Sequence, residues 1–530
     1  MKIFIPSAGV GTRISAYTRY RNKALLTLGN IPAITKIINK FDKDIPIVVA
    51  VGYQKEILKE YLTYAHNDRN IVFAEVDNYK GAGSGLGYTM LAAKKFLNEE
   101  FIFVPNDTII ENQEIQIDPS IEGNWFGAYK KVVGDGLDRL HYRCIIHNGA
   151  QKHNIAPKGI LSDEIYIGLC GIKDYEEFWC ALENPNAIIE GESLALNALN
   201  RKKPIYFENW IDTGNLESLS RATQVFKSDE YNILNKEDEA IWLFEDSVIK
   251  HHKDKKFISD RIKRLDFIDA SLTPELISVG STMFKYRKVQ GKVLSKTDNI
   301  NDYQNTLDVV NNKLWKHKEI DSRDKKSILE KFYFTKTLNR RLHYLDRFQE
   351  KDECLRINSL ECTSVDQLLK KVNWSKIYSN AIFTRFHGDF HQENIIVDTS
   401  GDIKLLDWRQ NFSDGEYEFG DVNYDLAKFM HGLIVDHNKV HLERFSVNYI
   451  NSSEIIIDIE TSFVKSQLLS TFEDWVNKNG YDLSLVRIHT ALIFINIAGL
   501  HDYPYSQFLF FLGQFLLQNE LRRGTEYMHT

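Results

Sequence analysis

The stretch that decides the fold of the N-terminal part is residues 3–13, IFIPSAGVGTR. A short apolar run with strand propensity leads into a turn with two glycines, Gly9 and Gly11, and then into a basic residue, Arg13. Glycine lets backbone N–H groups approach an anion closely, and an arginine neutralises phosphate charge. This order predicts a phosphate-binding turn after the first strand, with a plain turn between strand and helix as the structural alternative.

Around this stretch, the first hundred residues alternate short apolar runs with segments of helical periodicity. The runs are rich in β-branched residues, which predicts strands, and the segments between them have the spacing of amphipathic helices. Such alternation implies parallel strands joined by crossover helices, so we expect a doubly wound, Rossmann-like α/β domain. The predicted strands are Lys2–Ile5, Ile47–Val51, Ile71–Ala74 and Phe101–Val104, and the predicted helices are Ile31–Phe41, Gln54–Tyr61 and Leu86–Phe96.

Length and composition predict a globular protein with more than one core. The chain has 530 residues, 43% of them hydrophobic, and a formal charge of −7, which argues against a nucleic-acid partner. Its five cysteines form no C-x-x-C pair, so we expect neither a disulfide framework nor a zinc site, and a cytoplasmic location. The apolar stretches Thr490–Leu500 and Phe508–Leu517 are shorter than the ~20 residues of a membrane span, so we expect buried helices and no membrane insertion.

Residues 227–239 (KSDEYNILNKEDE) form a polar, charge-rich segment that predicts a domain boundary. A long solvated helix face or loop inside one domain is the alternative. Beyond it the sequence favours strands from Ile241 to about Gly291 and helices from Tyr303 onward. We therefore expect an N-terminal domain at 1–228 and a second domain at 239–530.

Segments downstream of the glycine turn match, together with it, the sequence pattern of a known family. The segments SAGVGTR (7–13) and KALLTLGNIP (23–32) together resemble the signature of the nucleotidyltransferase superfamily, which includes sugar-1-phosphate nucleotidyltransferases and phosphocholine cytidylyltransferases. Later segments agree with it over roughly residues 1–226: GAGSG (81–85), FVPNDT (103–108) and WIDTG (210–214). The resemblance implies catalytic roles for Arg13 and Lys23, magnesium ligation by Asp107 and Asp212, and nucleotide binding by Ala8, Gly9, Gly11, Thr12, Gly83 and Ser84.

The chemistry of nucleotidyl transfer accounts for these residue types. A phosphate attacks the α-phosphorus of a nucleoside triphosphate and pyrophosphate leaves, so two anions must be brought together. Mg²⁺ held by two carboxylates would bridge the phosphates, and Arg13 and Lys23 would stabilise the developing charge. The structural alternatives are turn capping for Asp107 and Asp212 and a surface position for Lys23.

The second family pattern lies near the end of the chain, in RFHGDFHQENIIV (385–397) followed by IKLLDW (403–408). The interval from Asp389 to Asn394 is five residues, as in the H-R-D-x-x-x-x-N catalytic loop of protein kinases. The pattern resembles aminoglycoside phosphotransferases, choline kinases and related small-molecule kinases. It implies a two-lobed, protein-kinase-like α+β domain in which Asp389 accepts the proton of a substrate hydroxyl, while Asn394 and Asp407 hold Mg²⁺ on ATP.

Upstream residues complete this second pattern. Lys250 resembles the strand lysine that grips the ATP phosphates, with an exposed strand lysine as an equal alternative. Tyr286 lies in a segment similar to the hinge that holds adenine. No G-x-G-x-x-G precedes Lys250, as in small-molecule kinases with a degenerate loop. We expect Asp421 and Asp425 to anchor the catalytic loop rather than to take part in chemistry.

Together the two patterns predict a bifunctional enzyme that uses Mg²⁺, ATP and a second NTP, for which we expect CTP. One half would phosphorylate a sugar or polyol, and the other would join that phosphate to a nucleoside monophosphate. The resemblance implies that the activated product is used to build surface polysaccharide. The alternative is an amino alcohol such as choline, held in an aromatic and acidic cage drawn from Trp408, Tyr417 and Glu418. A scaffold with decayed sites is a third hypothesis, which the intact carboxylates argue against. The sequence does not define an oligomeric state.

Overall fold

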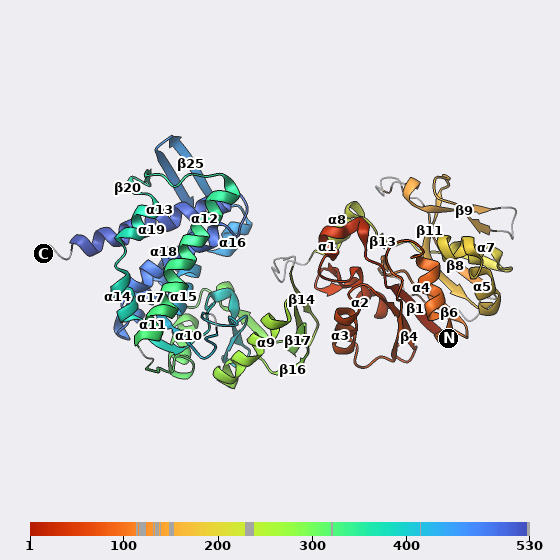
Figure 1. Cartoon of the computed structure of the whole chain (residues 1–530), viewed down its shortest axis with the longest axis horizontal. Helices are drawn as coiled ribbons and strands as arrows, with labels where there is room; N and C mark the ends of the chain where they lie inside the picture. Colours follow the sequence, from red (N-terminus) through yellow and green to blue (C-terminus); the bar gives the residue numbers. More distant parts are fainter. Residues whose placement is uncertain are drawn as a thin grey trace. The chain divides into compact units, whose positions relative to one another are not determined.

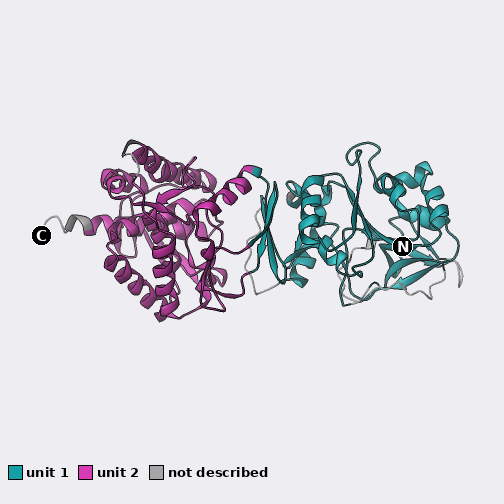
Figure 2. Cartoon of the chain, turned by 90° about the horizontal axis from the view of Figure 1, so that it is seen from below, with its two compact units in different colours: residues 1–255, 276–288 teal, residues 256–275, 289–530 magenta. Residues whose placement is uncertain are grey.

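The computed structural model describes residues 1–112, 115, 123–130, 132, 137, 139–147, 153–227, 238–319, 322–413 and 415–526. The chain divides into two compact units, coloured separately in Figure 2. Unit 1 comprises residues 1–255 and 276–288, and unit 2 comprises residues 256–275 and 289–530. Most of the predicted boundary segment, residues 228–237, lies outside the described residues.

The main sheet of unit 1 is parallel at its centre (Figure 1). Strand β1 (Lys2–Ser7) lies between β4 (Ile47–Val51) and β6 (Phe101–Phe103), and β5 (Ile71–Glu75) pairs with β4, all of them parallel. The predicted α/β core is thus confirmed. The sheet continues antiparallel from β6 into β11 (Glu164–Ile172), and its further strands are β8 (Asn124–Lys130), β9 (Arg143–His147), β10 (His153–Ile155) and β12 (Lys202–Tyr206).

Both faces of this sheet are covered because alternate residues of each strand point to opposite sides. Ile3 and Ile5 are fully buried in one core with helices α2 and α3, whereas Phe4 is fully buried in the other core with α4. The helices of unit 1 are α1 (Ser15–Thr18), α2 (Ala33–Ile38), α3 (Lys55–Ala65), α4 (Leu86–Ala93), α5 (Tyr175–Leu182), α6 (Pro185–Glu190), α7 (Glu192–Ala198) and α8 (Leu216–Val225).

Unit 1 also contains a four-stranded antiparallel sheet that follows the boundary segment in sequence. Its strands, in spatial order, are β14 (Glu239–Leu243), β15 (Ser247–His252), β17 (Met283–Arg287) and β16 (Leu276–Val279). Trp242 from β14 is fully buried: its ring meets that of Tyr61 edge-on, with 4.7 Å between centroids, and its indole N–H donates to Thr27 Oγ1 at 3.1 Å. This packing groups the sheet with the N-terminal core, whereas the sequence analysis placed all of 239–530 in one domain.

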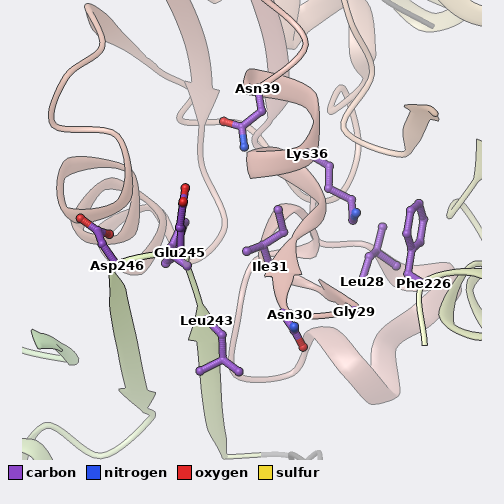
Figure 3. A pocket seen from close by; sticks show the side chains of 11 residues that line it. Leu28, Gly29, Asn30, Ile31, Lys36, Asn39, Phe226, Leu243, Glu245 and Asp246 are labelled. Carbon is purple, nitrogen blue, oxygen red and sulfur yellow. The ribbon is translucent and has the colours of Figure 1, made fainter. Parts of the chain in front are cut away.

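A cavity of about 560 Å³ lies where the turn between β14 and β15 approaches the hairpin of β2 (Thr27–Leu28) and β3 (Ile31–Pro32). Lys36 points along this cavity toward Phe226 (Figure 3), and its Nζ lies 3.8 Å from the centroid of that ring. Burial lowers the pKa of Lys36, while the charge of Glu111 opposes the shift. Of the described residues that line the cavity, none belongs to the predicted sites.

Unit 2 is mainly helical, as the periodicity after Tyr303 predicts. The stretch Thr490–Leu500 lies in α18 except for its last two residues, and Phe508–Leu517 lies in α19; the two helices pack on each other and these stretches are largely buried. Among the described residues, none of the helices combines the length and the apolar character needed to cross a bilayer. The helices are α9 (Lys255–Lys263, which begins in unit 1), α10 (Ile300–Lys313), α11 (Ser322–Leu329), α12 (Lys336–Phe348), α13 (Val365–Lys371), α14 (Trp374–Asn380), α15 (Val422–Ile434), α16 (His437–His441), α17 (Phe463–Lys478), α18 (Leu483–Ala498) and α19 (Tyr505–Glu526).

Short strands in unit 2 frame the predicted catalytic loop. The loop leaves β21 and leads into β22, and β21 pairs with β24 while β22 pairs with β18 and β23. A separate sheet joins strands that are about a hundred residues apart in sequence. The strands are β18 (Gly291–Val293), β19 (Leu355–Ile357), β20 (Leu360–Cys362), β21 (Phe383–Arg385), β22 (Ile395–Asp398), β23 (Ile403–Leu405), β24 (Phe419–Asp421), β25 (Phe445–Asn451) and β26 (Glu454–Ile459).

Trp242→Ala tests the packing of the four-stranded sheet on the N-terminal core. We expect it to lower the free energy of unfolding of unit 1 by about 4 kcal/mol, because a large buried side chain is replaced by a cavity. Trp242→Phe keeps most of the ring contact and is expected to cost about 1–2 kcal/mol. Urea unfolding followed by circular dichroism measures both.

Val225→Ala is the matched control, because that side chain is exposed in the same unit and its loss is expected to change stability by less than about 0.5 kcal/mol. Equal stability of Trp242→Ala and the control would show that the sheet does not depend on this contact.

Candidate functional site

Two predicted metal ligands of unit 1 meet at the ends of paired strands. Strand β7 (Thr108–Ile110) pairs antiparallel with β13 (Trp210–Asp212), with Thr108 opposite Asp212. The backbone N–H of Thr213 donates to Asp107 O at 3.0 Å. A Cβ atom built on Gly214 would lie 2.9 Å from Asp212 Oδ1 and 3.3 Å from Asp107 Oδ2. The two carboxylates therefore converge, and glycine at position 214 keeps the space beside them open.

Lys23 joins these carboxylates from a separate part of the chain. Its Nζ lies 2.6 Å from Asp107 Oδ2, with only 11% of the lysine side chain exposed. Burial alone would raise the pKa of Asp107, but Lys23 and then Arg13 outweigh it and hold this pKa below its usual value. Asp107 is therefore ionised at neutral pH, and the two predicted catalytic cations both act on it.

The two glycines of the predicted phosphate-binding turn differ in their surroundings. Gly11 has a φ of +73°, and a Cβ there would come within 3.1 Å of Thr18 Cγ2, so a side chain would be strained. A Cβ on Gly9 would meet nothing within 4 Å. Asn22, which is fully buried, donates to Ser7 O at 2.8 Å and so ties the segment that carries Lys23 to the end of β1.

The remaining predicted nucleotide-binding residues follow two parallel strands at the same edge of the sheet. Ala8 and Thr12 come after β1; Ala8 is buried and Thr12 is exposed. Gly83 and Ser84 come after β5, and Gly83 has a φ of +78°. Ser84 Oγ donates to Gly81 O at 2.7 Å within its own loop. Ligands of doubly wound sheets bind outside the carboxyl ends of the strands, which is where both loops begin.

Several residues near the carboxylates carry no motif and were missed in the sequence analysis. The Tyr142 hydroxyl donates to Asp212 Oδ2 at 2.9 Å. Burial, followed by Arg13 and Arg143, lowers the pKa of Lys158, while Asp107 and Asp212 raise it. The neighbourhood of the carboxylates therefore holds Lys158 and Arg143 as well as the two predicted cations.

Glu192 is a further residue that the sequence analysis missed. It begins α7, is 6% exposed and accepts a hydrogen bond from the Tyr166 hydroxyl at 3.1 Å. Burial raises the pKa of Glu192 to about 7, with Arg143 opposing the shift and Asp107 adding to it. A buried acid that titrates near neutral pH and feels both Asp107 and Arg143 is a functional candidate.

The donor set in unit 1 fits magnesium. Mg²⁺ prefers oxygen ligands and is commonly bound by one or two carboxylates together with substrate phosphates. Asp107 and Asp212 supply two carboxylates in contact with the same small space beside Gly214. Within the described part of the chain there is no group of three or more His, Cys, Asp or Glu residues that could hold a metal alone.

The predicted loop of unit 2 brings Asp389 together with Asn394, His391 and Lys428. Lys428 Nζ lies 2.9 Å from Asp389 Oδ1, and the Asn394 amide donates to Asp389 O at 2.9 Å. His391 Nε2 lies 3.6 Å from Asp389 Oδ2. Burial raises the pKa of Asp389, but Lys428 and His391 outweigh this effect and hold it well below its usual value. The carboxylate is therefore ionised and oriented.

A buried aspartate anchors this loop, as the sequence analysis expects of Asp425. Its carboxylate accepts from the backbone N–H groups of His387 and Gly388, both at 2.7 Å, and from Trp315 Nε1 at 3.1 Å. His387 Nε2 lies 2.8 Å from Leu406 O, which links the loop to the residue before Asp407. His387 is fully buried, and burial lowers its pKa to about 4, so it is a neutral structural residue.

The other predicted residues of the second site lie in different places. Asp407 has a φ of +56°, and its Oδ1 lies 2.8 Å from an Arg261 guanidinium nitrogen. The N–H of Leu406, which precedes Asp407, donates to Asn394 O at 2.7 Å. The Asn394 side-chain oxygen and the Asp407 carboxylate are oxygen donors of the kind that Mg²⁺ prefers. Lys250 and Tyr286 belong to strands β15 and β17 of unit 1, and both are buried.

Comparisons with known proteins concern the N-terminal part. No protein-family model matches the chain. The bifunctional protein GlmU of Methanococcus aeolicus is 33% identical over 113 residues, which are 21% of this chain and 26% of that protein. GlmU of Methanocaldococcus jannaschii is 30% identical over 113 residues, with the same coverage. The chain spans about a quarter of the length of these curated relatives.

Solved structures similar to this chain include UDP-glucose pyrophosphorylase from Acinetobacter baumanii, at 16% identity and a TM-score of 0.36, covering 42% of this chain and 92% of that one. The nucleoside-diphosphate-sugar pyrophosphorylase from Vibrio cholerae gives 16% identity and a TM-score of 0.34, covering 42% of this chain and 99% of that one.

Glu192→Gln tests the environment of the buried acid. The folded chain holds the Glu192 proton up to about pH 7, whereas the unfolded chain releases it near the ordinary value of 4.5. The stability contribution of this proton is therefore present at low pH and is lost as pH rises toward 7. Glutamine stays neutral, so relative to the wild type the variant should gain about 2–3 kcal/mol between pH 5 and pH 8.

Urea unfolding at both pH values measures this difference, and Glu183→Gln, at an exposed position in the same unit, is the control. Parallel pH curves for Glu192→Gln and the wild type would contradict the assigned pKa.

Proposed function

We propose that this chain is a bifunctional enzyme with a nucleotidyltransferase in its N-terminal part and a small-molecule kinase in its C-terminal part. The kinase would phosphorylate a hydroxyl compound with ATP. The nucleotidyltransferase would join that phosphate to a nucleoside monophosphate from an NTP and release pyrophosphate. The observation that supports the nucleotidyltransferase activity is that Lys23, Asp107 and Asp212 converge beside Gly214.

In the nucleotidyltransferase reaction, the oxygen of the acceptor phosphate attacks the α-phosphorus of the NTP and the bond to pyrophosphate breaks. Arg13 and Lys23 offset the charge of the two anions and of the leaving group. Asp107 and Asp212 would hold Mg²⁺, which supplies charge neutralisation between the phosphates when bound. Tyr142, by donating to Asp212, fixes the orientation of that carboxylate. No protein nucleophile is needed.

In the kinase reaction, the substrate hydroxyl attacks the γ-phosphorus and ADP leaves. Asp389 orients the hydroxyl by accepting its hydrogen bond and takes its proton as the new bond forms. Lys428 and Asn394 hold the carboxylate and the loop in place before substrate arrives. Asn394 and Asp407 would hold Mg²⁺ on the ATP phosphates. Roles in ATP binding for Lys250 and Tyr286, like CTP as the second nucleotide, stay predictions.

We propose a sugar or polyol as the compound that is phosphorylated and then activated. The similarity to the pyrophosphorylases and the W-x-D-x-G segment that contains Asp212 support this choice. The structure offers less for choline. Trp408 is 4% exposed and donates to Arg261 O. Glu418 lies 3.6 Å from Arg385, and the ring of Tyr417 already has two lysine ammonium groups within 6 Å. Trp408 is therefore buried and bonded to the backbone, and Glu418 and Tyr417 are engaged by the protein's own cations.

A crossed pair of variants tests the division of labour. Asp389→Asn is expected to lower ATP-dependent phosphorylation by about 10³-fold or more, because the proton acceptor is lost, while pyrophosphate release from a supplied sugar 1-phosphate and NTP is unchanged. Asp212→Ala is expected to do the reverse, because it removes one metal-binding carboxylate. ADP formation and pyrophosphate release are measured separately for each variant.

Asp402→Asn and Asp44→Ala, at exposed positions in units 2 and 1, are the matched controls. Loss of both activities in either site variant would contradict two independent sites.

A further inference from the structure

Three cationic side chains lie near the carboxylate that is proposed to activate the substrate hydroxyl, and a fourth lies near one of them. Lys428 from α15 is the nearest, with its Nζ 2.9 Å from Asp389 Oδ1 and 12% of its side chain exposed. The others are Lys336 and Arg340, four residues apart on α12, and Arg409, which follows Asp407 by two residues. None of them belongs to a motif identified in the sequence.

Lys336 and Arg409 both lie near the ring of Phe332. Lys336 Nζ lies 4.3 Å from the centroid of the Phe332 ring, and Arg409 Cζ lies 5.1 Å from the same centroid. The side chain of Arg409 also passes Gly388, since a Cβ on that glycine would come within 2.6 Å of Arg409 Cβ. Arg409 therefore lies against the residue that precedes Asp389.

Among the described residues, Lys428 is the member of this cluster that forms an ion pair with a carboxylate. Asp389 is already engaged by Lys428, and in the described residues no carboxylate forms an ion pair with Lys336. Burial lowers the pKa of Lys336 well below its usual value, and Arg409, Lys428 and Arg340 lower it further, with Asp389 opposing them. Like charges held together in a partly desolvated place are costly unless an anion joins them.

We propose that the hydroxyl compound phosphorylated at Asp389 carries an anionic group, a carboxylate or a phosphate, which binds to Lys336 and Arg409. This inference rests on the proposed kinase function and narrows its substrate class to hydroxy acids, sugar acids and phosphorylated alcohols. It excludes choline and other cations, which the cluster would repel.

The reaction balances without a further reagent. The substrate hydroxyl oxygen forms a bond to the γ-phosphorus of ATP, and the bond from that phosphorus to the ADP oxygen breaks. The hydroxyl proton passes to Asp389 and then to solvent, and ADP carries away the electron pair of the broken bond. Lys336 and Arg409 hold the anionic group of the acceptor and take no part in bond making.

A competing account assigns the same cations to the γ-phosphate of ATP. The two accounts differ in which substrate responds to the loss of Lys336. If the lysine binds the acceptor, its removal raises the KM for the acceptor and leaves the KM for ATP unchanged. If it binds the γ-phosphate, the KM for ATP or kcat changes for every acceptor alike.

The first experiment measures acceptor-dependent ADP formation by the full-length protein with Mg·ATP and a matched panel. D-glycerate, glycerol 3-phosphate, glycerol and choline share a small hydroxylated skeleton but carry a carboxylate, a phosphate, no charge and a positive charge, respectively. We expect kcat/KM to be at least about tenfold higher for one of the two anions than for glycerol and choline. The two anionic arms distinguish carboxylate from phosphate. A preference for glycerol or choline would overturn the inference while leaving the kinase in place.

The second experiment measures binding, so it does not depend on turnover. Isothermal titration calorimetry first measures the affinity of the full-length protein for a non-hydrolysable Mg·ATP analogue. The nucleotide-loaded protein is then titrated with D-glycerate and, separately, with glycerol 3-phosphate. We expect Lys336→Met to weaken binding of the favoured anion about tenfold, the loss of one charge-assisted contact, with nucleotide affinity within twofold of the wild type. Lys336→Arg, which keeps the charge, should restore most of the binding.

Lys371→Met is the matched control, because it removes one exposed lysine from the same unit. Equal anion affinity in Lys336→Met and this control would overturn the inference, as would nucleotide binding with no anion binding at all. Absence of nucleotide binding would instead overturn the proposed kinase function itself.

Discussion

A carboxylate that is wholly or partly withdrawn from water needs donors or cations of its own, and three carboxylates of this chain meet that requirement. In unit 1 the ammonium of Lys23 lies on Asp107. In unit 2 the carboxylate of Asp425 takes two backbone N–H groups and an indole N–H, and Asp389 takes an ammonium from α15. Each pairing joins residues far apart in sequence, so the same contacts that satisfy the carboxylates also hold the loops in position.

The two sites meet this requirement with cations from several parts of the chain. Around Asp107 and Asp212 lie the cations Lys23, Arg13, Arg143 and Lys158. Around Asp389 lie Lys428 and Lys336, and Lys336 in turn lies near Arg409 and Arg340. In both places an anionic substrate would offset positive charge.

The sequence was sufficient for elements whose signal is local. The parallel core strands were predicted to within one or two residues because each is a short apolar run between turns, and Asp107 and Asp212 stand in recognisable segments. Residues brought in by long-range packing had no such signal. Glu192 lies in an ordinary polar stretch, and Lys336 lies on an amphipathic helix rich in basic residues. Their importance comes from burial and neighbours, which periodicity does not reveal.

The sheet of residues 239–287 follows the charged segment in sequence but packs on the N-terminal core. Trp242 fits between Tyr61 and Thr27, and Glu60 accepts hydrogen bonds from Thr282. If the chain were divided at the charged segment, the N-terminal fragment would expose the apolar surface that Trp242 covers. The C-terminal fragment would lose the core on which strands β14 to β17 pack. Division at that point would therefore destabilise both fragments, whereas an N-terminal fragment that extends to the end of β17 would keep the sheet that covers its core.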